Sequence, residues 1–423
     1  MLFQFKTKPE DFIVKEELWF KPSGKWDVFF VRFQKKEINT MDIVQHLCYG
    51  MKLERKELGI AGLKDKNWIT EQRISIYKKI LNRIWWEKKF LEVLGQKATI
   101  LETARHTEPL AVWKNAGNYF KIRLEAKKEI TPEIKEKIES NIEKILKNWF
   151  PNCFGKQRFG KGYRNFYRAK EIFENRVSSF LKEGDHEVVE DFLPDSVQKI
   201  FSPQLAEQAS DSSFKKERKP KTGDFEIRFK LQAYASMYFN EYTIKRRHKW
   251  QIFLWWDIMV NSNNFETKVW IYNEWKVSLF NYEKCKAEFE WKDLIQPYYL
   301  SGETIDITKD NKWRQPTWPM LGFNLLTPPL DTKAWVKDNE LLQETDFENL
   351  WIKTAKKYNI YWFRRPLWTK PKNLKYERNK NNDLILSFSL PTGSYATIFL
   401  WTVLDWIDDK TIIENWLEIP LIK

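Results

Sequence analysis

The chain has 423 residues, with 72 Lys and Arg against 58 Asp and Glu, which gives a formal net charge of +14. This length allows one large core or two to three domains. The basic charge favours a polyanion such as nucleic acid as partner, although a soluble protein from a lysine-rich proteome would carry a similar charge. We expect no zinc site and no disulfide framework, because the three cysteines and four histidines are scattered.

The N-terminal stretch lacks the apolar core of a signal peptide, and no apolar run is long enough to cross a bilayer. We therefore expect a cytoplasmic protein with no membrane partner. No oligomeric state follows from the sequence, and a monomer is the default expectation.

Apolar alternation predicts a β-hairpin or paired strands in residues 9–34, with a turn at 22–24. Asn39 and Thr40 then form a helix cap. The apolar residues of that helix lie on one face, at Ile43, Val44, Leu47 and Met51.

Residues 59–72 read as strand, loop and strand, because an apolar run is followed by Lys64-Asp65-Lys66 and then by renewed alternation. Residues 118–124 alternate like another strand. Thr131 and Pro132 begin a helix with apolar residues at helical spacing, namely Ile134, Ile138, Ile142, Ile145 and Leu146.

The second half of the chain is less regular. Residues 209–224 are polar and charged, which is typical of a solvated loop or linker. A helical pattern returns in 225–247, short strands and turns dominate 250–330, and 384–397 read as a strand that enters a turn. There is no internal repeat, and the predicted class is α+β.

Two segments are candidates for chemistry. Asp65 follows a strand and lies between two lysines, whose charge favours the ionised carboxylate, a base or nucleophile. On spacing alone, an exposed loop is the stronger interpretation. Residues 152–160 combine two aromatic residues, an arginine and two glycines, which could stack on a base and approach a phosphate. A buried aromatic turn with Arg158 in a salt bridge explains this segment equally well.

Six blocks, taken together and in order, resemble the TruD-type tRNA pseudouridine synthases. They span nearly the whole chain, and their co-occurrence is far more specific than any one of them. The blocks are Lys6 with 9–16, Asn39-Thr40, 61–66 with 70–72, 117–120, 152–160 and 390–397.

The resemblance implies a pseudouridine-synthase catalytic fold, a mixed and mostly antiparallel sheet with flanking helices. It implies that residues 1–164 and 366–423 form this discontinuous domain. A large inserted α+β domain of the TRUD type would occupy residues 165–365.

The resemblance also implies isomerisation of a uridine in tRNA, typically at position 13, without a cofactor or metal. The family's essential carboxylate falls on Asp65, which either adds to C1′ or removes the C2′ proton. Its substrate-binding residues fall on Lys6, Phe12, Asn118, Phe120 and Tyr395.

The residue types suit this chemistry. Lys6 would keep Asp65 ionised, the aromatic faces would sandwich a flipped base, and Asn118 would read its imide edge. For each aromatic residue alone, core packing is the plainer interpretation. Residues that could support the site or contact RNA are Gln72, Gln157, Arg158 and Phe159.

Tryptophan occurs where glycine is expected. The chain has 14 glycines and 22 tryptophans, and the two together make up about 8.5% of its 423 residues, close to the ordinary glycine share of about 7%. Trp149 directly follows a predicted helix, where a left-handed residue is usual, and Trp26 and Trp275 fall in predicted turns. The resembled family usually has glycine at Trp19, Trp113, Trp149, Trp256 and Trp318.

We therefore hypothesise that many of these tryptophans are encoded by UGA codons that the source organism reads as glycine. The hypothesis extends to Trp68, three residues after Asp65. The alternative is a tryptophan-rich protein with Trp in unusual turns. For function, the alternatives to the tRNA enzyme are a non-catalytic RNA-binding or RNA-folding protein on the same scaffold and a synthase that acts on another RNA.

Overall fold

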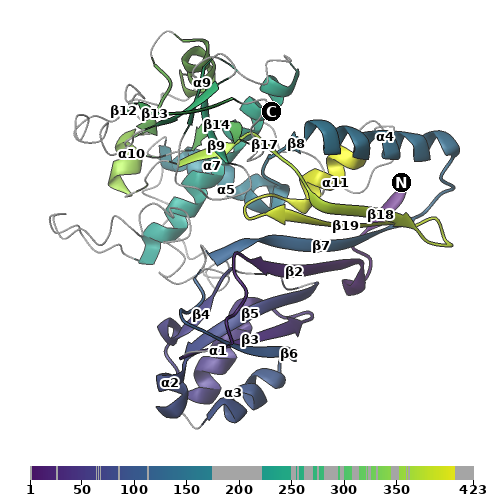
Figure 1. Ribbon diagram of the computed structural model, residues 1–423, viewed down its shortest axis with the longest axis vertical. Coiled ribbons are helices and arrows are strands. Elements are labelled where there is room, and N and C mark those ends of the chain that lie inside the picture. Colours follow the sequence, from purple (N-terminus) through teal and green to yellow (C-terminus); the bar gives the residue numbers. More distant parts are fainter. Residues whose placement is uncertain are drawn as a thin grey trace. The chain divides into compact units, whose positions relative to one another are not determined.

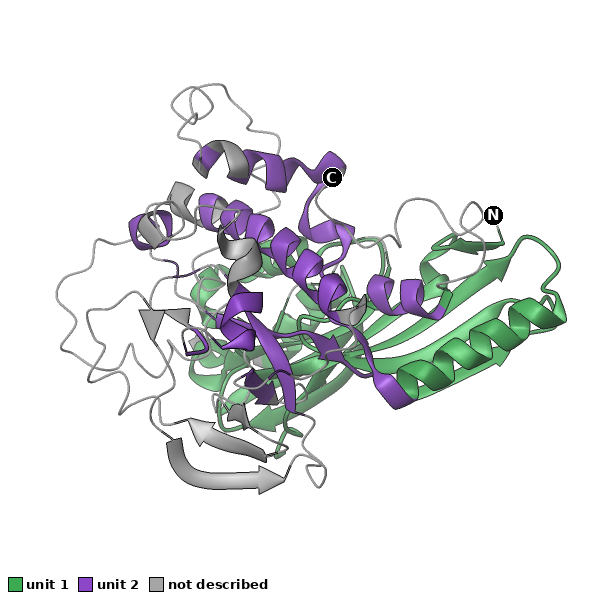
Figure 2. Cartoon of the chain, turned by 90° about the horizontal axis from the view of Figure 1, so that it is seen from above, with its two compact units in different colours: residues 1–146, 371–396, 404–414 green, residues 147–370, 397–403, 415–423 purple. Residues whose placement is uncertain are grey.

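The structure is a computed structural model that divides into two compact units (Figure 2). Unit 1 contains the described residues of 1–146 and 371–396 together with Leu404, and unit 2 those of 147–370 and 397–403. These limits differ from the boundaries predicted at 164 and 365, and the assignment of a catalytic and an inserted domain stays a prediction. The described residues are 2–24, 27–62, 64, 66, 68–83, 86–111, 114–173, 222–248, 254, 257–261, 270–273, 276–280, 294–295, 300–306, 314–320, 322, 325–329, 332–343, 352–358, 360 and 363–404.

Unit 1 is built around a nine-stranded sheet with the order β18-β19-β7-β2-β5-β3-β6, in which β1 also pairs with β7 and β4 with β5 (Figure 1). Among the described strands of this sheet, β2 and β5 alone pair in parallel. The chain therefore has the predicted α+β class with a large mixed sheet. The strands are β1 (Phe3–Phe5), β2 (Phe12–Leu18), β3 (Val28–Lys35), β4 (Leu58–Ile60), β5 (Ile69–Tyr77), β6 (Thr99–His106), β7 (Asn115–Ala126), β18 (Lys372–Arg378) and β19 (Leu384–Pro391).

The strands predicted in residues 9–34 form, but they do not pair with each other. β5 lies between β2 and β3, so the expected hairpin is wrong. β5 is buried along most of its length. A strand of this kind is stabilised by neighbours on both edges, and such long-range pairing is invisible in a local pattern.

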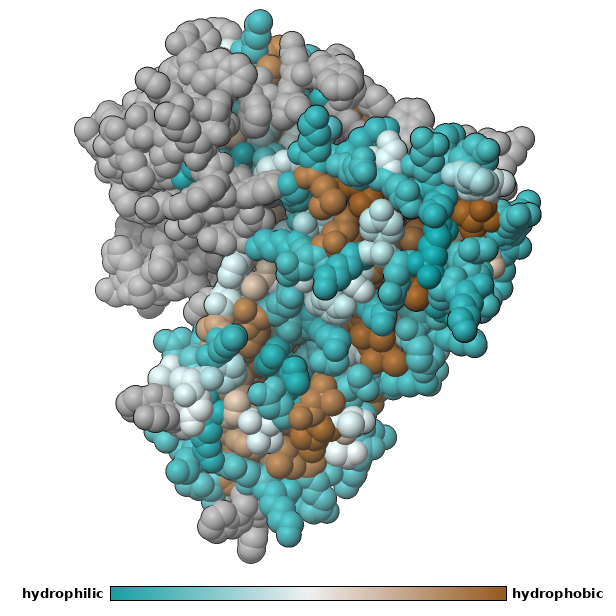
Figure 3. All heavy atoms as spheres, turned by 45° about the vertical axis from the view of Figure 1, so that its right-hand side comes forward, coloured by the Kyte–Doolittle hydropathy of each residue, from teal (hydrophilic) through white to brown (hydrophobic). Residues whose placement is uncertain are grey.

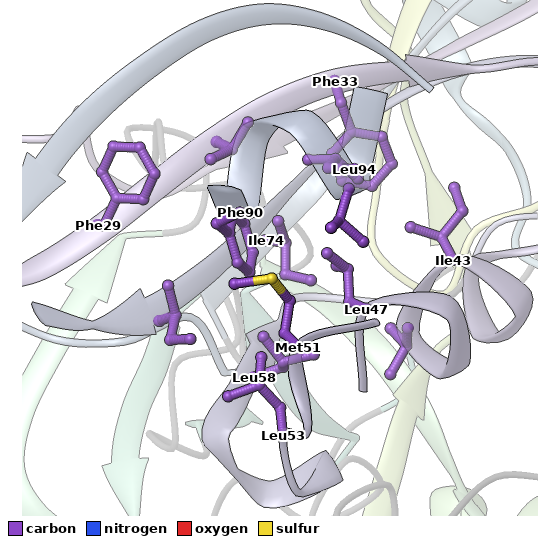
Figure 4. Close-up of a cluster of buried hydrophobic side chains, with 14 of the residues drawn as sticks. Phe29, Phe33, Ile43, Leu47, Met51, Leu53, Leu58, Ile74, Phe90 and Leu94 are labelled. Atoms are coloured by element: carbon purple, nitrogen blue, oxygen red, sulfur yellow. The ribbon is translucent and has the colours of Figure 1, made fainter. Parts of the chain in front are cut away.

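Helix α1 (Thr40–Met51) begins at the predicted cap, where Asn39 Oδ1 accepts a hydrogen bond from the amide of Asp42 at 2.7 Å. With α2 (Lys78–Arg83) and α3 (Trp86–Gly95), it belongs to the helical part of unit 1. The predicted face is confirmed, since its four apolar residues are all buried. Figure 4 shows the core that they form with strand residues, including Phe29, Phe33, Ile43, Leu47, Met51, Ile74, Phe90 and Leu94.

Helix α4 (Pro132–Asn148) follows β7 and begins at the predicted proline. Three of its five predicted apolar positions are buried, whereas Leu146 is exposed. The next residue, Trp149, has φ +73°. The left-handed conformation predicted at this position is therefore confirmed, and it is one that glycine adopts at no steric cost.

Unit 2 contains a six-stranded sheet of order β13-β11-β10-β9-β14-β16 and two-stranded pairs β12–β15 and β8–β17. The short strands predicted in 250–330 include the antiparallel pair β10 and β11, and Trp275, between them, lies outside the described residues. The strands are β8 (Phe150–Pro151), β9 (Ile258–Asn261), β10 (Trp270–Asn273), β11 (Lys276–Phe280), β12 (Leu294–Ile295), β13 (Leu300–Asp306), β14 (Arg314–Met320), β15 (Leu325–Leu326), β16 (Phe363–Pro366) and β17 (Trp368–Thr369).

The helix predicted in 225–247 is confirmed as α7, and the loop predicted in 209–224 lies outside the described residues up to position 221. Within the described ranges, no helix combines the length and apolar character needed to cross a membrane. On the face shown in Figure 3, hydrophilic side chains cover much of the described surface, with separate apolar patches. The remaining helices are α5 (Arg164–Phe173), α7 (Thr222–His248), α9 (Lys333–Gln343), α10 (Ile352–Lys357) and α11 (Ala396–Leu404).

Candidate functional site

The strand registers of unit 1 place several predicted site residues on one face of the sheet. Val14 of β2 lies opposite Phe120 of β7, and Glu16 lies opposite Asn118. Directly opposed residues share a face, and side chains two positions apart on a strand do so as well. Phe12, Glu16, Asn118 and Phe120 therefore project from the same side, which we call the site face.

The same alternation extends the site face across the parallel pair. Val14 lies opposite Thr70 of β5, and Thr70 opposite Lys35 of β3. Gln72, two residues beyond Thr70, shares the face. A row of buried polar residues, Glu16, Thr70, Lys35 and Gln72, thus crosses the centre of the sheet.

Aromatic rings and one lysine meet at the end of the site face near β1. The Phe12 and Phe120 rings are 6.0 Å apart in an edge-to-face arrangement, and Phe120 stacks on Phe388 at 5.5 Å. The Lys6 Nζ lies 4.4 Å from the centre of the Phe12 ring and 4.6 Å from that of Trp68. This is the geometry of a cation–π interaction.

Lys6 also has an unusual backbone, with φ +61° directly after β1. A left-handed conformation of a non-glycine residue costs about 1–2 kcal/mol. Such strain clusters at functional sites, where surrounding contacts enforce it. The strained backbone, together with the place of Lys6 among the aromatic rings, is therefore a second feature that marks this residue as a candidate site residue.

Asn118 is positioned by the close approach of β7 and β19. A Cβ at the preceding Gly117 would clash with the carbonyl oxygen of Leu390, so only glycine fits there. The Asn118 Oδ1 is buried and has no hydrogen-bond partner among the described residues. Since an unsatisfied buried acceptor is costly, this oxygen is suited to a donor from a ligand.

Tyr395 follows a turn that is tied to the start of β7. The Thr392 hydroxyl donates to the Asn115 carbonyl at 2.8 Å, and the Ser394 amide donates to the Pro391 carbonyl at 3.1 Å. Gly393 within this turn has φ +83°. Pro391, the last residue of β19, lies opposite Gly117, which precedes Asn118 on β7. The turn that leads to Tyr395 therefore begins beside Asn118.

The segment that carries Asp65 connects β4 to β5. Asp65 itself lies outside the described residues, and so do Leu63 and Asn67. Its neighbour Lys64 is well fixed. The Lys64 amide donates to Thr40 Oγ1 at 3.0 Å, and the Thr40 hydroxyl in turn donates to Gln72 Oε1 at 2.9 Å.

Glu16 is the most buried carboxyl group of the site face. Its Oε2 accepts from the Arg73 amide at 3.0 Å, and its Oε1 lies 4.0 Å from Lys64 Nζ. Burial raises the pKa of Glu16, and the charges of Lys64 and Arg73 and the bond from the Arg73 amide offset this only in part. We did not assign Glu16 a role from the sequence.

The alternation of apolar and polar residues in β2 already marks Glu16 as unusual. In Phe12-Ile13-Val14-Lys15-Glu16, the glutamate occupies the apolar phase of an alternating strand, where a charged residue is unexpected. Phe388 was also missed, although it continues the apolar alternation of Leu384 and Leu386. Contacts between distant strands, such as those of Phe388 with Phe120, have no local signature.

Gln157, Arg158 and Phe159 lie in unit 2 and are not among the residues that meet on the site face. Phe159 is fully buried, and the Arg158 guanidinium donates to Gln232 at 3.2 Å and to Ser236 at 3.3 Å on α7. It also lies over the Phe229 ring at 4.8 Å. A role in contacting RNA stays a prediction for these residues.

In the given sequence, residue 68 is a tryptophan whose ring lies among the aromatic residues around Lys6. Its ring lies 5.6 Å from that of Phe12 and faces Lys6. A glycine at this position would remove one side of the aromatic surround of Lys6. Whether position 68 is glycine in the source organism stays a prediction, as it does for the other tryptophans.

The sequence is similar to those of known tRNA pseudouridine synthases. The family described as "tRNA pseudouridine synthase D (TruD)" matches residues 3–184. The tRNA pseudouridine synthase D of Aquifex aeolicus is 27% identical over 421 residues, covering 95% of this chain and 97% of the relative. That of Helicobacter hepaticus is 32% identical over 174 residues, which span 41% of this chain and 44% of the relative.

A solved structure shares the fold. The putative tRNA pseudouridine synthase D of Methanosarcina mazei aligns with a TM-score of 0.53 at 20% identity, covering 95% of this chain and 92% of that chain. The family match covers the part of the chain that carries Lys6, Phe12, Asn118 and Phe120 on one face. The full-length relative and the solved structure extend the likeness to almost the whole chain. The chain is therefore similar to the tRNA pseudouridine synthases of the TruD family, by the family match over residues 3–184 and by the full-length relative.

Proposed function

We propose that this protein converts a uridine of tRNA, that at position 13, to pseudouridine, with Asp65 as the essential carboxylate. The observation that carries the proposal is the grouping of Lys6, Phe12, Phe120 and Asn118 on one face of the sheet, beside the anchored neighbour of Asp65. We expect the reaction to take place in the cytoplasm.

The reaction is an isomerisation. The bond between N1 and C1′ breaks, the uracil turns, and C5 bonds to C1′. The C5 hydrogen leaves as a proton and N1 gains one, so atoms and electrons balance without a cofactor. A carboxylate is needed either to add to C1′ and hold the sugar as an ester, or to take the C2′ proton and give a glycal.

The neighbouring residues have defined tasks in this proposal. The rings of Phe12, Phe120 and Tyr395 hold a uracil taken out of the base stack, because aromatic faces bind any planar base. The unpartnered Asn118 Oδ1 accepts the N3 proton of uracil, and the amide nitrogen of Asn118 donates to a uracil oxygen. The Lys6 ammonium favours the ionised form of Asp65.

The net charge of +14 supports a polyanionic substrate. Each phosphate contact releases counterions, so the affinity for tRNA falls steeply as salt rises. Binding at low salt alone does not distinguish an enzyme from a non-catalytic RNA-binding protein, and the decisive experiment must therefore follow the product.

The experiment maps pseudouridine at single-nucleotide resolution. Unmodified transcripts of tRNA and of a ribosomal RNA fragment are incubated with the protein, treated with a carbodiimide and read by primer extension. A stop at position 13 of tRNA alone is expected. Stops only in the other RNA would assign a different substrate, and bound but unmodified RNA would contradict the enzyme. A 2′-deuterated uridine then separates the two routes. Only the glycal route breaks the bond between C2′ and its hydrogen in a slow step, so only this route is slowed by the deuterium.

A further inference from the structure

Glu16 occupies the point at which β2 and β5 separate. The two strands pair in parallel only from Ile13 with Ile69 to Lys15 with Glu71. At the next position the Glu16 side chain accepts the Arg73 amide at 3.0 Å, and Arg73 Nη1 donates back to the Glu16 carbonyl at 3.0 Å. The carboxylate is thus fixed to both strands at the centre of the sheet.

The second oxygen of this carboxylate lies near Lys64, the residue before Asp65 in the sequence. Glu16 Oε1 has no hydrogen-bond partner among the described residues, and Lys64 Nζ lies 4.0 Å away. Both side chains are almost entirely buried, at 0% and 8% exposure. A buried carboxylate attracts a buried ammonium strongly, because solvent does not screen the pair.

Lys64 is held from its other side as well. Its amide donates to the Thr40 hydroxyl at 3.0 Å, and that hydroxyl is placed by Gln72 at 2.9 Å. Thr40 belongs to α1 and Gln72 to β5, so two rigid elements fix the backbone of the residue that immediately precedes Asp65. Side chains held by such surrounding contacts give a reacting group a defined position.

We propose that Glu16 and Lys64 form a positioning pair that holds the Asp65 segment in the orientation needed for its reaction with the flipped uridine. Neither residue touches the substrate. Glu16 also lies opposite Asn118 on β7, so one rigid unit sets both the base-reading amide and the segment of the carboxylate. This inference rests on the proposed function.

The test compares variants of the full chain in single-turnover reactions with saturating protein. Glu16→Gln keeps the acceptor for Arg73 but removes the charge, and Lys64→Met removes the ammonium. Each is expected to slow the chemical step about 100-fold, the loss typical of a displacement of about 1 Å at a reacting group. Affinity for tRNA is expected to stay unchanged, and Lys64→Arg is expected to restore most of the rate.

Lys114→Met is the matched control. The Lys114 side chain is as buried as that of Lys64 and pairs with Glu108 at 2.7 Å, but Lys114 directly precedes β7. Melting temperatures are recorded for every variant. If Glu16→Gln does not fold, the single-turnover rate of Lys64→Gln replaces it. This variant removes the ammonium group, while its amide still offers Glu16 a hydrogen-bond donor.

The outcomes separate the inference from the proposed function. An inactive unsubstituted protein would contradict the proposed function and this inference with it. An active protein whose Glu16 and Lys64 variants are no slower than Lys114→Met, or lose tRNA affinity in proportion to rate, would contradict the positioning pair alone.

Discussion

Arg123 Nη1 donates to Asp383 Oδ2 at 2.9 Å and so joins residues that are 260 positions apart in the chain. The same guanidinium donates through Nε to Asp11 Oδ1 at 2.7 Å. Asp383 Oδ1 also accepts the amide of Ala126 at 2.9 Å. This arrangement fastens the C-terminal strands of unit 1 to β7 and to the residue before Phe12, so it supports the site without belonging to it.

Asp11→Asn and Asp383→Asn are each expected to destabilise the fold by about 2 kcal/mol near pH 7, because each removes a charged acceptor from Arg123. Burial raises the pKa of Asp11, but hydrogen bonds from Arg123, Thr7 and the Lys8 amide outweigh it and leave the pKa below its usual value.

The pKa of Asp383 is lowered in the same way, with burial opposed by the Ala126 amide, Asn379 and Arg123. A lowered pKa gives stability that is present above the unfolded pKa, about 3.9, and is lost as pH falls through the folded value. Urea unfolding between pH 7 and 2.5 should show a shallower acid decline in either variant. Glu92→Gln, which breaks an exposed ion pair with Lys89, is the control. An unchanged acid decline in both aspartate variants would argue against the linkage.

Gly117→Ala is expected to disturb the site through the backbone. The added Cβ would meet the Leu390 carbonyl, so β7 and β19 must separate at the position of Asn118. Overpacking of this kind costs about 1–3 kcal/mol. Gly95→Ala is the matched control, since its Cβ would meet only Ile100 Cδ1 at 3.9 Å. Unfolding free energies and pseudouridine formation should fall for Gly117→Ala only, and equal behaviour of the two variants would refute the steric account.

Arg158→Lys tests whether this arginine serves the fold or the RNA. Its internal bonds to Gln232 and Ser236 predict a loss of about 2 kcal/mol of stability, because lysine cannot reproduce the two bonds of the guanidinium. The affinity for tRNA at fixed salt should not change, since the positive charge is kept and the group is buried. Weaker tRNA binding with unaltered stability would assign Arg158 to the RNA surface instead.

Trp149→Gly is expected to stabilise the protein relative to Trp149→Ala by about 1 kcal/mol. Both variants remove the indole, but only glycine relieves the left-handed backbone at φ +73°. Thermal unfolding of the two variants provides the comparison. If alanine is as stable as glycine, the strain argument at this position fails.

The codon hypothesis needs a separate measurement on the source. It predicts UGA at positions 113, 149, 256, 275 and 318 and glycine in peptides of the native protein. The buried Trp318 Nε1 has no hydrogen-bond partner among the described residues, which is unusual for a native indole. UGG codons at these positions would end the hypothesis.

The predictable parts of the fold were local. The Asn39 cap, the apolar face of α1, the proline start of α4 and the left-handed Trp149 each follow from a short pattern with a direct physical cause. The order of strands was not predictable in this way. The pairing of β2 with β5 in place of β3 depends on which buried strand fills the centre of the sheet.

The site could be predicted in part for the same reason. Phe12, Phe120 and Asn118 alternate correctly within their own strands, and family resemblance drew attention to them. Glu16 and Arg123 act through partners more than 50 residues away, so their importance emerges only when the strands are side by side. Arg158 shows the converse, because its arginine–aromatic pattern fits RNA binding and internal packing equally well.

Tritium release from tRNA transcripts that carry 5-³H-uridine tests the central claim most directly. The unsubstituted protein and its Asp65→Ala variant are compared, each also in a version with glycine at 19, 113, 149, 256 and 318. The account predicts release by the parent and none by a folded Asp65→Ala variant that still binds tRNA. Equal release from both would show that Asp65 is not the essential carboxylate, and no release from a folded parent that binds tRNA would contradict the enzyme.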